Sequence, residues 1–180
     1  MRIIPEEDIE IKAIPLVAKP PVIIEYKIVM ERKISTYHIT RADGSTRRYT
    51  SMINLLENIN REDLETIWKI VKDKYGNTRP EEGYERVLWG DLKVMFEPDI
   101  ESEVWRQLQG HGVTIWKLFS LCGVHFVRFK NLHIFLVVDK VYPLTPVIIK
   151  MMLERKLQAD QWNEMCYQLL KLMMKQLRKQ

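Results

Sequence analysis

The chain has 180 residues, of which 46% are hydrophobic and 29% charged, and its formal net charge of +4 is small. This length and apolar content suit one globular domain with a buried core, while the low charge is only weak support for a nucleic-acid partner. Two cysteines, Cys122 and Cys166, are too few for a disulfide framework and favour a reducing compartment.

The sequence also argues against a membrane protein. The N-terminus lacks the basic, apolar and small-residue succession of a signal peptide. The longest uninterrupted apolar run, 134–138, is too short to cross a bilayer. We therefore expect an intracellular protein, cytoplasmic or nuclear, that makes no contact with a membrane.

Residues 1–21 are predicted to be a linker that is extended and weakly ordered. Four prolines interrupt this stretch, and Glu6, Glu7, Asp8 and Glu10 make it acidic. A single α+β domain is expected to follow, over residues 22–180.

The first part of that domain is predicted to be an antiparallel β meander. Apolar residues alternate with polar ones over 22–30 and 34–41, and a polar turn at 31–33 separates the two runs. Asp43-Gly44 is a strong hairpin signal and leads to a third strand through Arg47, Arg48 and Tyr49.

Helices are expected next, over 52–59, 60–76 and 79–97. Asn60 is a good N-cap, Asp63 stands where a capping-box acid would reach back, and Gly76 supplies the left-handed stop. Pro80 suits the first position of the third helix. The expected buried face of that helix comprises Tyr84, Val87, Leu88, Leu92, Met95 and Phe96.

These two long helices are predicted to pack together through Trp68 and Leu88, with Leu64 buried. Gly90 is expected at a close contact with another backbone, because glycine in a helix interior otherwise lowers stability.

A short helix through Trp105 and a second meander, over 113–121, 124–129 and 132–138, are predicted to follow. Thr145-Pro146 is expected to begin another helix, and Asp160 to cap a last one over 161–179. The apolar stripe of that last helix predicts either docking on the second meander, which we favour, or contact with a partner chain. The residues that would make the partner contact are Trp162, Leu169 and Met173.

No catalytic motif, metal site or cofactor site is predicted. The chain has no phosphate-binding glycine loop, no Gly-x-Ser-x-Gly elbow and no His-Glu-x-x-His. Cys122 and His125, with His111 and His133 nearby, lack the paired spacing of a zinc site. Asp91, Glu97 and Asp99 form an acidic group that is more simply structural.

The first meander carries a candidate basic face. Cations interleaved with aromatic residues suit phosphate contact and base stacking, although a solvated strand face is the simpler interpretation. RNA or single-stranded DNA would be the ligand. The candidate contact residues are Lys27, Arg32, Lys33, Arg41, Arg47, Arg48 and Tyr49.

Seven short segments together resemble one region of plant LTR retrotransposon polyproteins of the copia-like type. They are YHITRADG (37–44), NREDLE (60–65), LWGD (88–91), MFEPD (95–99), WKLFSLCGVH (116–125), KVYPL (140–144) and KLQ (156–158). The resemblance covers about residues 21–177. The Tyr-x-Asp-Asp turn of a reverse transcriptase, the acidic triad of an integrase and the gag Cys-His knuckle are not found in the chain.

The resemblance implies a non-catalytic accessory or protein-interaction module of a retrotransposon-derived polyprotein. Its partners would be other parts of that polyprotein. A nucleic-acid-binding module that uses the basic face is the first alternative, and an unrecognised or degenerate enzyme is the second.

Overall fold

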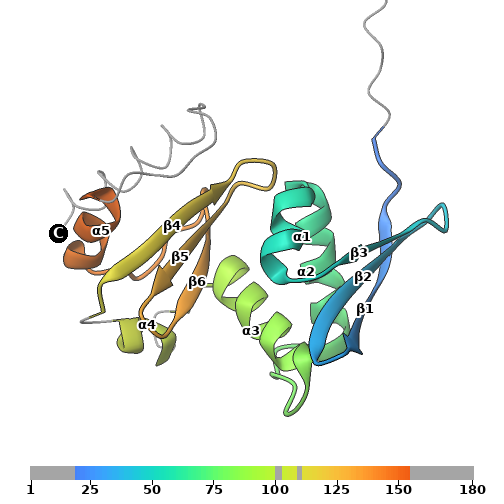
Figure 1. Cartoon of the computed structure of the whole chain (residues 1–180), viewed down its shortest axis with the longest axis horizontal. Helices are drawn as coiled ribbons and strands as arrows, with labels where there is room; N and C mark the ends of the chain where they lie inside the picture. Colours follow the sequence, from blue (N-terminus) through green and yellow to red (C-terminus); the bar gives the residue numbers. More distant parts are fainter. Residues whose placement is uncertain (1–18, 100–102, 109–110, 155–180) are drawn as a thin grey trace, which may run out of the picture.

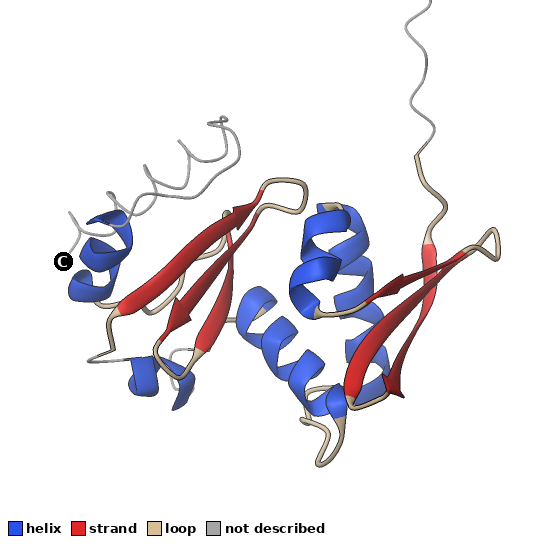
Figure 2. Ribbon diagram, viewed as in Figure 1, coloured by secondary structure: helices blue, strands red, loops and turns tan. Residues whose placement is uncertain are grey.

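The computed structural model describes residues 19–99, 103–108 and 111–154. In this part of the chain, two three-stranded antiparallel sheets and five helices form a single-domain α+β arrangement. Four layers follow one another in Figures 1 and 2: α4 and α5, the second sheet, the helices α1 to α3, and the first sheet. The elements are β1 (Ile23–Glu31), β2 (Ile34–Arg41), β3 (Thr46–Tyr49), α1 (Met52–Asn58), α2 (Arg61–Tyr75), α3 (Tyr84–Phe96), α4 (Glu103–Leu108), β4 (Val113–Phe119), β5 (Val124–Phe129), β6 (His133–Val137) and α5 (Pro146–Glu154).

The first sheet is the predicted meander, in the order β1-β2-β3. Its inner face is apolar because Tyr26, Tyr37, Ile39 and Tyr49 point towards the helices and are buried. The hairpin between β1 and β2 turns through two residues with positive φ, Arg32 and Lys33. Neither is a glycine, so this turn carries backbone strain.

Helix α2 confirms most of its predicted signals. Asn60 accepts a hydrogen bond from the Asp63 amide, and Gly76 ends the helix with a φ of 62°. Leu64 is 0% exposed, as expected. The capping-box role of Asp63 is wrong: its carboxylate binds Arg41 of β2 instead. A tertiary ion pair has taken the place of the local contact.

Helix α3 begins later than predicted. Residues 81–83 form bends, and Gly83 becomes the N-cap with a φ of 80°. Leu88, Leu92, Met95 and Phe96 are buried as predicted, whereas Tyr84 and Val87, which were expected to be inside, are exposed. Trp89 is buried in their place, and it packs edge-on against Trp68 of α2 at 6.4 Å between ring centroids.

The second sheet, in the order β4-β5-β6, confirms the second predicted meander. Both of its faces are covered. One carries Phe119, Phe126 and Phe135 into the core that it shares with α1 to α3. The other carries Trp116 and Phe129 into a separate core with α4 and α5. The sheet is thus a wall between two apolar cores.

Several predictions lie outside the described residues. They concern most of the linker at 1–21 and the helix at 161–179 with Trp162, Leu169 and Met173. The domain boundary at residue 22 therefore stays a prediction. Within the described ranges, every helix is too short or too polar to span a bilayer.

Candidate functional site

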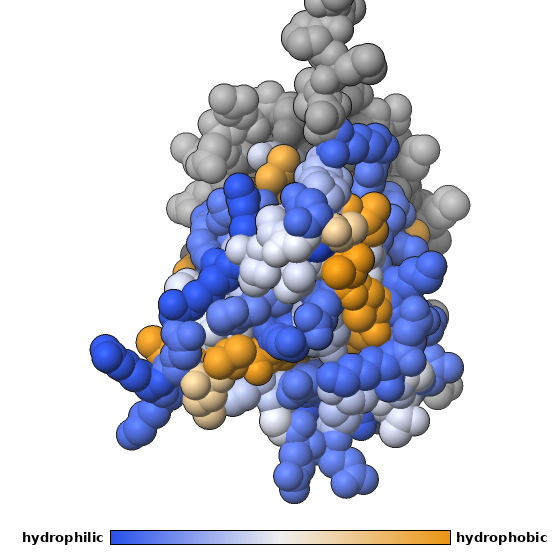
Figure 3. Space-filling view, turned by 90° about the vertical axis from the view of Figure 1, so that its right-hand side faces the viewer, coloured by the Kyte–Doolittle hydropathy of each residue, from blue (hydrophilic) through white to orange (hydrophobic). Residues whose placement is uncertain are grey.

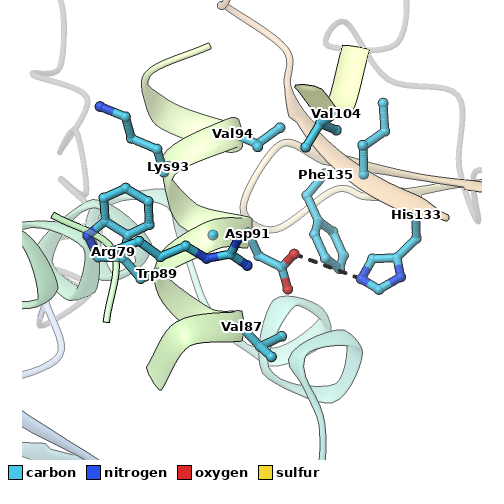
Figure 4. A pocket seen from close by; sticks show the side chains of 11 residues that line it. Arg79, Val87, Trp89, Asp91, Lys93, Val94, Val104, His133 and Phe135 are labelled. Carbon is cyan, nitrogen blue, oxygen red and sulfur yellow. Dashed lines mark ion pairs between the residues drawn. The ribbon is translucent and has the colours of Figure 1, made fainter. Parts of the chain in front are cut away.

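A groove runs between helix α3 and the second sheet, and we call it the central groove. It consists of two adjoining cavities of about 230 Å³ and 500 Å³. Val87, Asp91, His133 and Phe135 line both cavities and so mark the middle of the groove. Figure 4 shows the smaller cavity, with side chains from α3 and from the second sheet pointing into it.

Asp91 and His133 face each other across the middle of the groove (Figure 4). The His133 Nε2 lies 3.9 Å from the Asp91 Oδ1, and the two side chains are 48% and 20% exposed. The Asp91 carboxylate raises the pKa of His133 above 6.5, while burial and the Arg128 charge oppose the rise. Burial and the Asp91 charge raise the pKa of nearby Tyr37 to about 12.

Four cations line the groove, on both sides of this pair. Arg79 and Lys93 belong to the smaller cavity, and Arg128 and Lys130 belong to the larger one. Lys93 is ion-paired with Glu97 at 2.7 Å. Among the described residues, Arg79, Arg128 and Lys130 have no carboxylate within ion-pair distance. The groove therefore carries uncompensated positive charge.

Arg79 reaches its position because residue 90 has no side chain. A Cβ atom at Gly90 would lie 3.0 Å from the Arg79 Nη2, so the guanidinium lies directly over the backbone of α3. The Arg79 Nε donates a hydrogen bond to the Arg86 carbonyl at 3.3 Å. Gly90 thus does lie at a close contact, but with a side chain rather than with another backbone.

The apolar surface of the groove is aliphatic. Val87 is 50% exposed and Ile53 is 36% exposed. The Tyr, Trp and Phe residues that line the cavities are at most 8% exposed and belong to the core. They are Tyr37, Trp89, Phe126 and Phe135.

Tyr142 holds the two walls of the groove together. Its buried hydroxyl donates to the Met95 carbonyl of α3 at 2.6 Å and accepts from the Val137 amide of β6 at 2.7 Å. Burial raises the pKa of this phenol, which keeps the donating proton in place. The end of α3 is therefore tied to the end of β6.

The candidate nucleic-acid residues do not share one face. Arg41 and Tyr49 point inward, Arg41 to Asp63 and Tyr49 into the core, so the prediction of a single basic face is wrong for these two. Alternation along a strand explains this, because odd and even positions of β2 and β3 point to opposite sides. Lys27 pairs with Glu25.

The remaining members of that set are at the surface. Arg48 pairs with Glu31, whereas Arg32, Lys33 and Arg47 are exposed. Figure 3 views the side of the molecule that carries the first sheet, and its surface is mostly hydrophilic with separate apolar bands. Whether these residues bind nucleic acid stays a prediction.

The histidine and cysteine group is divided between the two cores. Cys122 donates from its thiol to the Leu56 carbonyl at 3.3 Å, and burial raises its pKa to about 11. His125 accepts at Nδ1 from the Trp116 Nε1, so its neutral ring carries the proton on Nε2. Burial lowers the pKa of His125 to about 3. In the described ranges, no three His, Cys, Asp or Glu side chains converge as metal ligands.

Sequence reasoning identified some of the groove residues but did not bring them together. Asp91 was grouped with Glu97 and Asp99, yet Glu97 binds Lys72 and Lys93 while Asp91 faces His133. Arg79, Arg128 and Lys130 were not singled out, because no local motif relates α3 to β5 and β6. The exposure of Val87 was not expected either, because the apolar spacing of α3 placed it on the buried face.

Comparisons with protein-family models, curated proteins and solved structures found no match to the chain. The central groove combines an ion pair, cations without a carboxylate partner among the described residues, and exposed aliphatic side chains. Ser51 is the one serine or threonine among the described residues that line the groove. Its hydroxyl oxygen accepts a hydrogen bond from the Asn54 amide at 3.0 Å, as the N-cap of α1.

Proposed function

We propose that this chain is a non-catalytic protein-interaction module of a retrotransposon-derived polyprotein, and that its central groove binds a segment from another part of that polyprotein. The observation that carries the proposal is the groove itself. It combines exposed aliphatic side chains with uncompensated cations. It lies between α3 and the second sheet, which the Tyr142 hydroxyl joins by hydrogen bonds. Exposed apolar groups beside polar ones are typical of interaction surfaces.

The buried side chains of Cys122 and His125 are poorly suited to catalysis. A nucleophilic cysteine needs a lowered pKa and access, whereas the Cys122 thiol is buried with a raised pKa. A general base works best with a pKa near neutrality, whereas that of His125 is about 3. The resemblance to a polyprotein region outside the reverse transcriptase and integrase cores agrees with this view.

Site-specific photocrosslinking tests the proposal. A photoreactive phenylalanine analogue at Val87 would be combined with separately purified segments of the same reading frame. We expect one segment to crosslink at position 87 and not at the control position Lys69, an exposed residue on the outer surface of α2. Equal crosslinking at both positions, or none at 87, would contradict the proposal.

A nucleic-acid-binding module remains the alternative, and the exposed cations Arg32, Lys33 and Arg47 favour it. Binding of RNA and single-stranded DNA would be measured over a range of salt concentrations. Phosphate contacts give an affinity that falls steeply with salt. If the alternative holds, replacing these three cations by Gln flattens that slope, and the photocrosslinks at Val87 do not form.

A further inference from the structure

The charges of the central groove indicate what kind of segment it binds. The two cations of the outer face of the first sheet, Lys27 and Arg48, each have a carboxylate partner. Arg79, Arg128 and Lys130 have none among the described residues. Arg32, Lys33 and Arg47 of the first sheet also have none there, but only the first three cations line one groove. Unpaired cations that gather around one groove complement an anionic partner.

These cations lie on both sides of the middle of the groove. Arg128 lies opposite His133 in the register of β5 and β6, so its side chain stands on the α3 side of the sheet. Arg79 lies over Gly90 and lines the smaller cavity, on the other side of the Asp91–His133 pair. Positive groups therefore flank the exposed Val87 side chain on both sides.

The uncharged lining favours a peptide over a nucleic acid. Single-stranded nucleic acids bind on exposed aromatic rings that stack with the bases. Here the lining Tyr, Trp and Phe rings are buried, only the His133 imidazole is half exposed, and the exposed apolar groups are the aliphatic side chains of Val87 and Ile53. Aliphatic surface suits the branched side chains of a peptide.

Building on the proposed function, we infer that the partner segment is an acidic peptide with aliphatic residues between its carboxylates. Its carboxylates pair with Arg79, Arg128 and Lys130, and an aliphatic side chain packs on Val87. The Asp91 charge, directed at His133, does not cancel this preference, because it is one carboxylate against three unpaired cations.

Fluorescence anisotropy with short labelled peptides tests the inference on the full chain. The probe peptide alternates Glu with Leu. One control peptide replaces every Glu by Gln, a second replaces every Leu by Ser, and an oligothymidylate of similar length represents single-stranded DNA. The protein variants are the triple change Arg79→Gln, Arg128→Gln and Lys130→Gln, and the matched control Arg32→Gln, Lys33→Gln and Arg47→Gln.

We expect the Glu-Leu peptide to bind more tightly than both control peptides and the oligonucleotide. The groove triple variant should lose about tenfold or more in affinity, and the matched control should lose little, although both lose three charges. Added salt should weaken binding because the pairs are solvent-accessible.

Three results would overturn the inference: equal binding of the Gln-Leu peptide, equal loss in the two triple variants, or tighter binding of the oligonucleotide in the groove. None of these depends on the crosslinking at Val87. A polyprotein segment that crosslinks there but is neutral leaves the proposed function in place and removes the acidic preference. Absence of both crosslinking and peptide binding removes both.

Discussion

The guanidinium of Arg41 in β2 and the carboxylate of Asp63 in α2 form a two-point ion pair, with distances of 3.2 Å for Nη1–Oδ1 and 2.6 Å for Nη2–Oδ2. The Arg41 Nη1 also donates to the Pro21 carbonyl at 2.7 Å. Because the Arg41 and Asp63 side chains are only 16% and 11% exposed, water screens this pair weakly. The pair joins the first sheet to the start of the helix that packs beneath it.

Replacing Asp63 by Asn should therefore lower the free energy of unfolding by about 1.5–3 kcal/mol, the range for hydrogen bonds to charged groups. The loss has a clear cause: a nearly buried guanidinium is left without its counter-charge. Urea denaturation of the wild type and the variant measures it. Glu31→Gln, which breaks the exposed pair with Arg48, is the matched control and should cost less than about 1 kcal/mol. Equal losses would show that burial does not strengthen the Arg41 pair.

Leu64→Ala should lower the free energy of unfolding by about 2–5 kcal/mol, because the side chain is 0% exposed and its removal leaves a cavity. Val87→Ala is the control from the neighbouring helix. Its side chain is 50% exposed, so its effect on stability should stay within about 0.5 kcal/mol. A Val87 effect as large as that of Leu64 would contradict the exposed position of Val87.

The strained turn of the first hairpin should accept a stabilising change. Arg32 and Lys33 have φ values of 47° and 72°, the region that Asn and Gly adopt most readily in two-residue hairpins. Arg32→Asn combined with Lys33→Gly should raise the free energy of unfolding by about 1–2 kcal/mol. Arg32→Ala combined with Lys33→Ala removes the same charges but keeps the strain, so it should give no such gain. A matching gain in the alanine variant would assign the effect to charge.

The two histidines should respond to pH in opposite ways. The pKa of His133 is raised, so its protonation favours the folded state, and this contribution is complete below the unfolded pKa of about 6.5 and is lost above the folded pKa. The pKa of His125 is lowered to about 3, so the unfolded state binds more protons between pH 3 and 6.5, and stability falls as the pH falls through that range.

Proton NMR of the imidazole rings checks both signs. We expect His133 to titrate above pH 6.5, Asp91→Asn to move its midpoint down, and His125 to stay neutral throughout the physiological range. A normal midpoint for His125 would mean that water reaches its ring. An unchanged His133 midpoint in Asp91→Asn would mean that the carboxylate does not act on it.

Gly90→Ala should separate stability from binding. Alanine favours the interior of α3 by up to about 1 kcal/mol, but its Cβ would lie 3.0 Å from the Arg79 Nη2, so the guanidinium must shift from its position over the α3 backbone. We expect a small rise in thermal stability together with weaker binding of the Glu-Leu peptide. Lys69→Ala, on the exposed surface of α2, is the control, and it should leave peptide binding unchanged.

Local chemistry explains which elements could be predicted from the sequence. Asn60 and Gly76 bracket α2 with hydrogen bonds and a φ value that depend on a few neighbouring residues, so that helix is readable in isolation. The start of α3 is not. Pro80 is a good first helical residue, but Gly83 has a φ of 80°, which is not a helical angle. The helix therefore begins only after Gly83, at Tyr84.

The groove depends on tertiary packing and is harder to read. Asp91 and His133 are separated by a helix, two strands and their connections, and nothing in either residue's neighbours specifies the other. The apolar pattern of α3 also misplaced Val87, which it assigned to the face that buries Leu88 and Leu92. The burial of Trp89 instead depends on its contact with Trp68 of α2, which the local sequence does not specify.

Because the second sheet contributes side chains to both apolar cores, neither core can be completed during synthesis until this sheet has been made. Residues 23–96 emerge first, but their core is closed by Phe119, Phe126 and Phe135, which are made later. Until β4 to β6 are made, the side of α3 that contacts β6 has no cover. The sheet in turn needs Ile148 and Ile149 of α5 on its other side. A cut between α3 and β4 should therefore give two pieces that aggregate when expressed singly and regain solubility only when they are produced together.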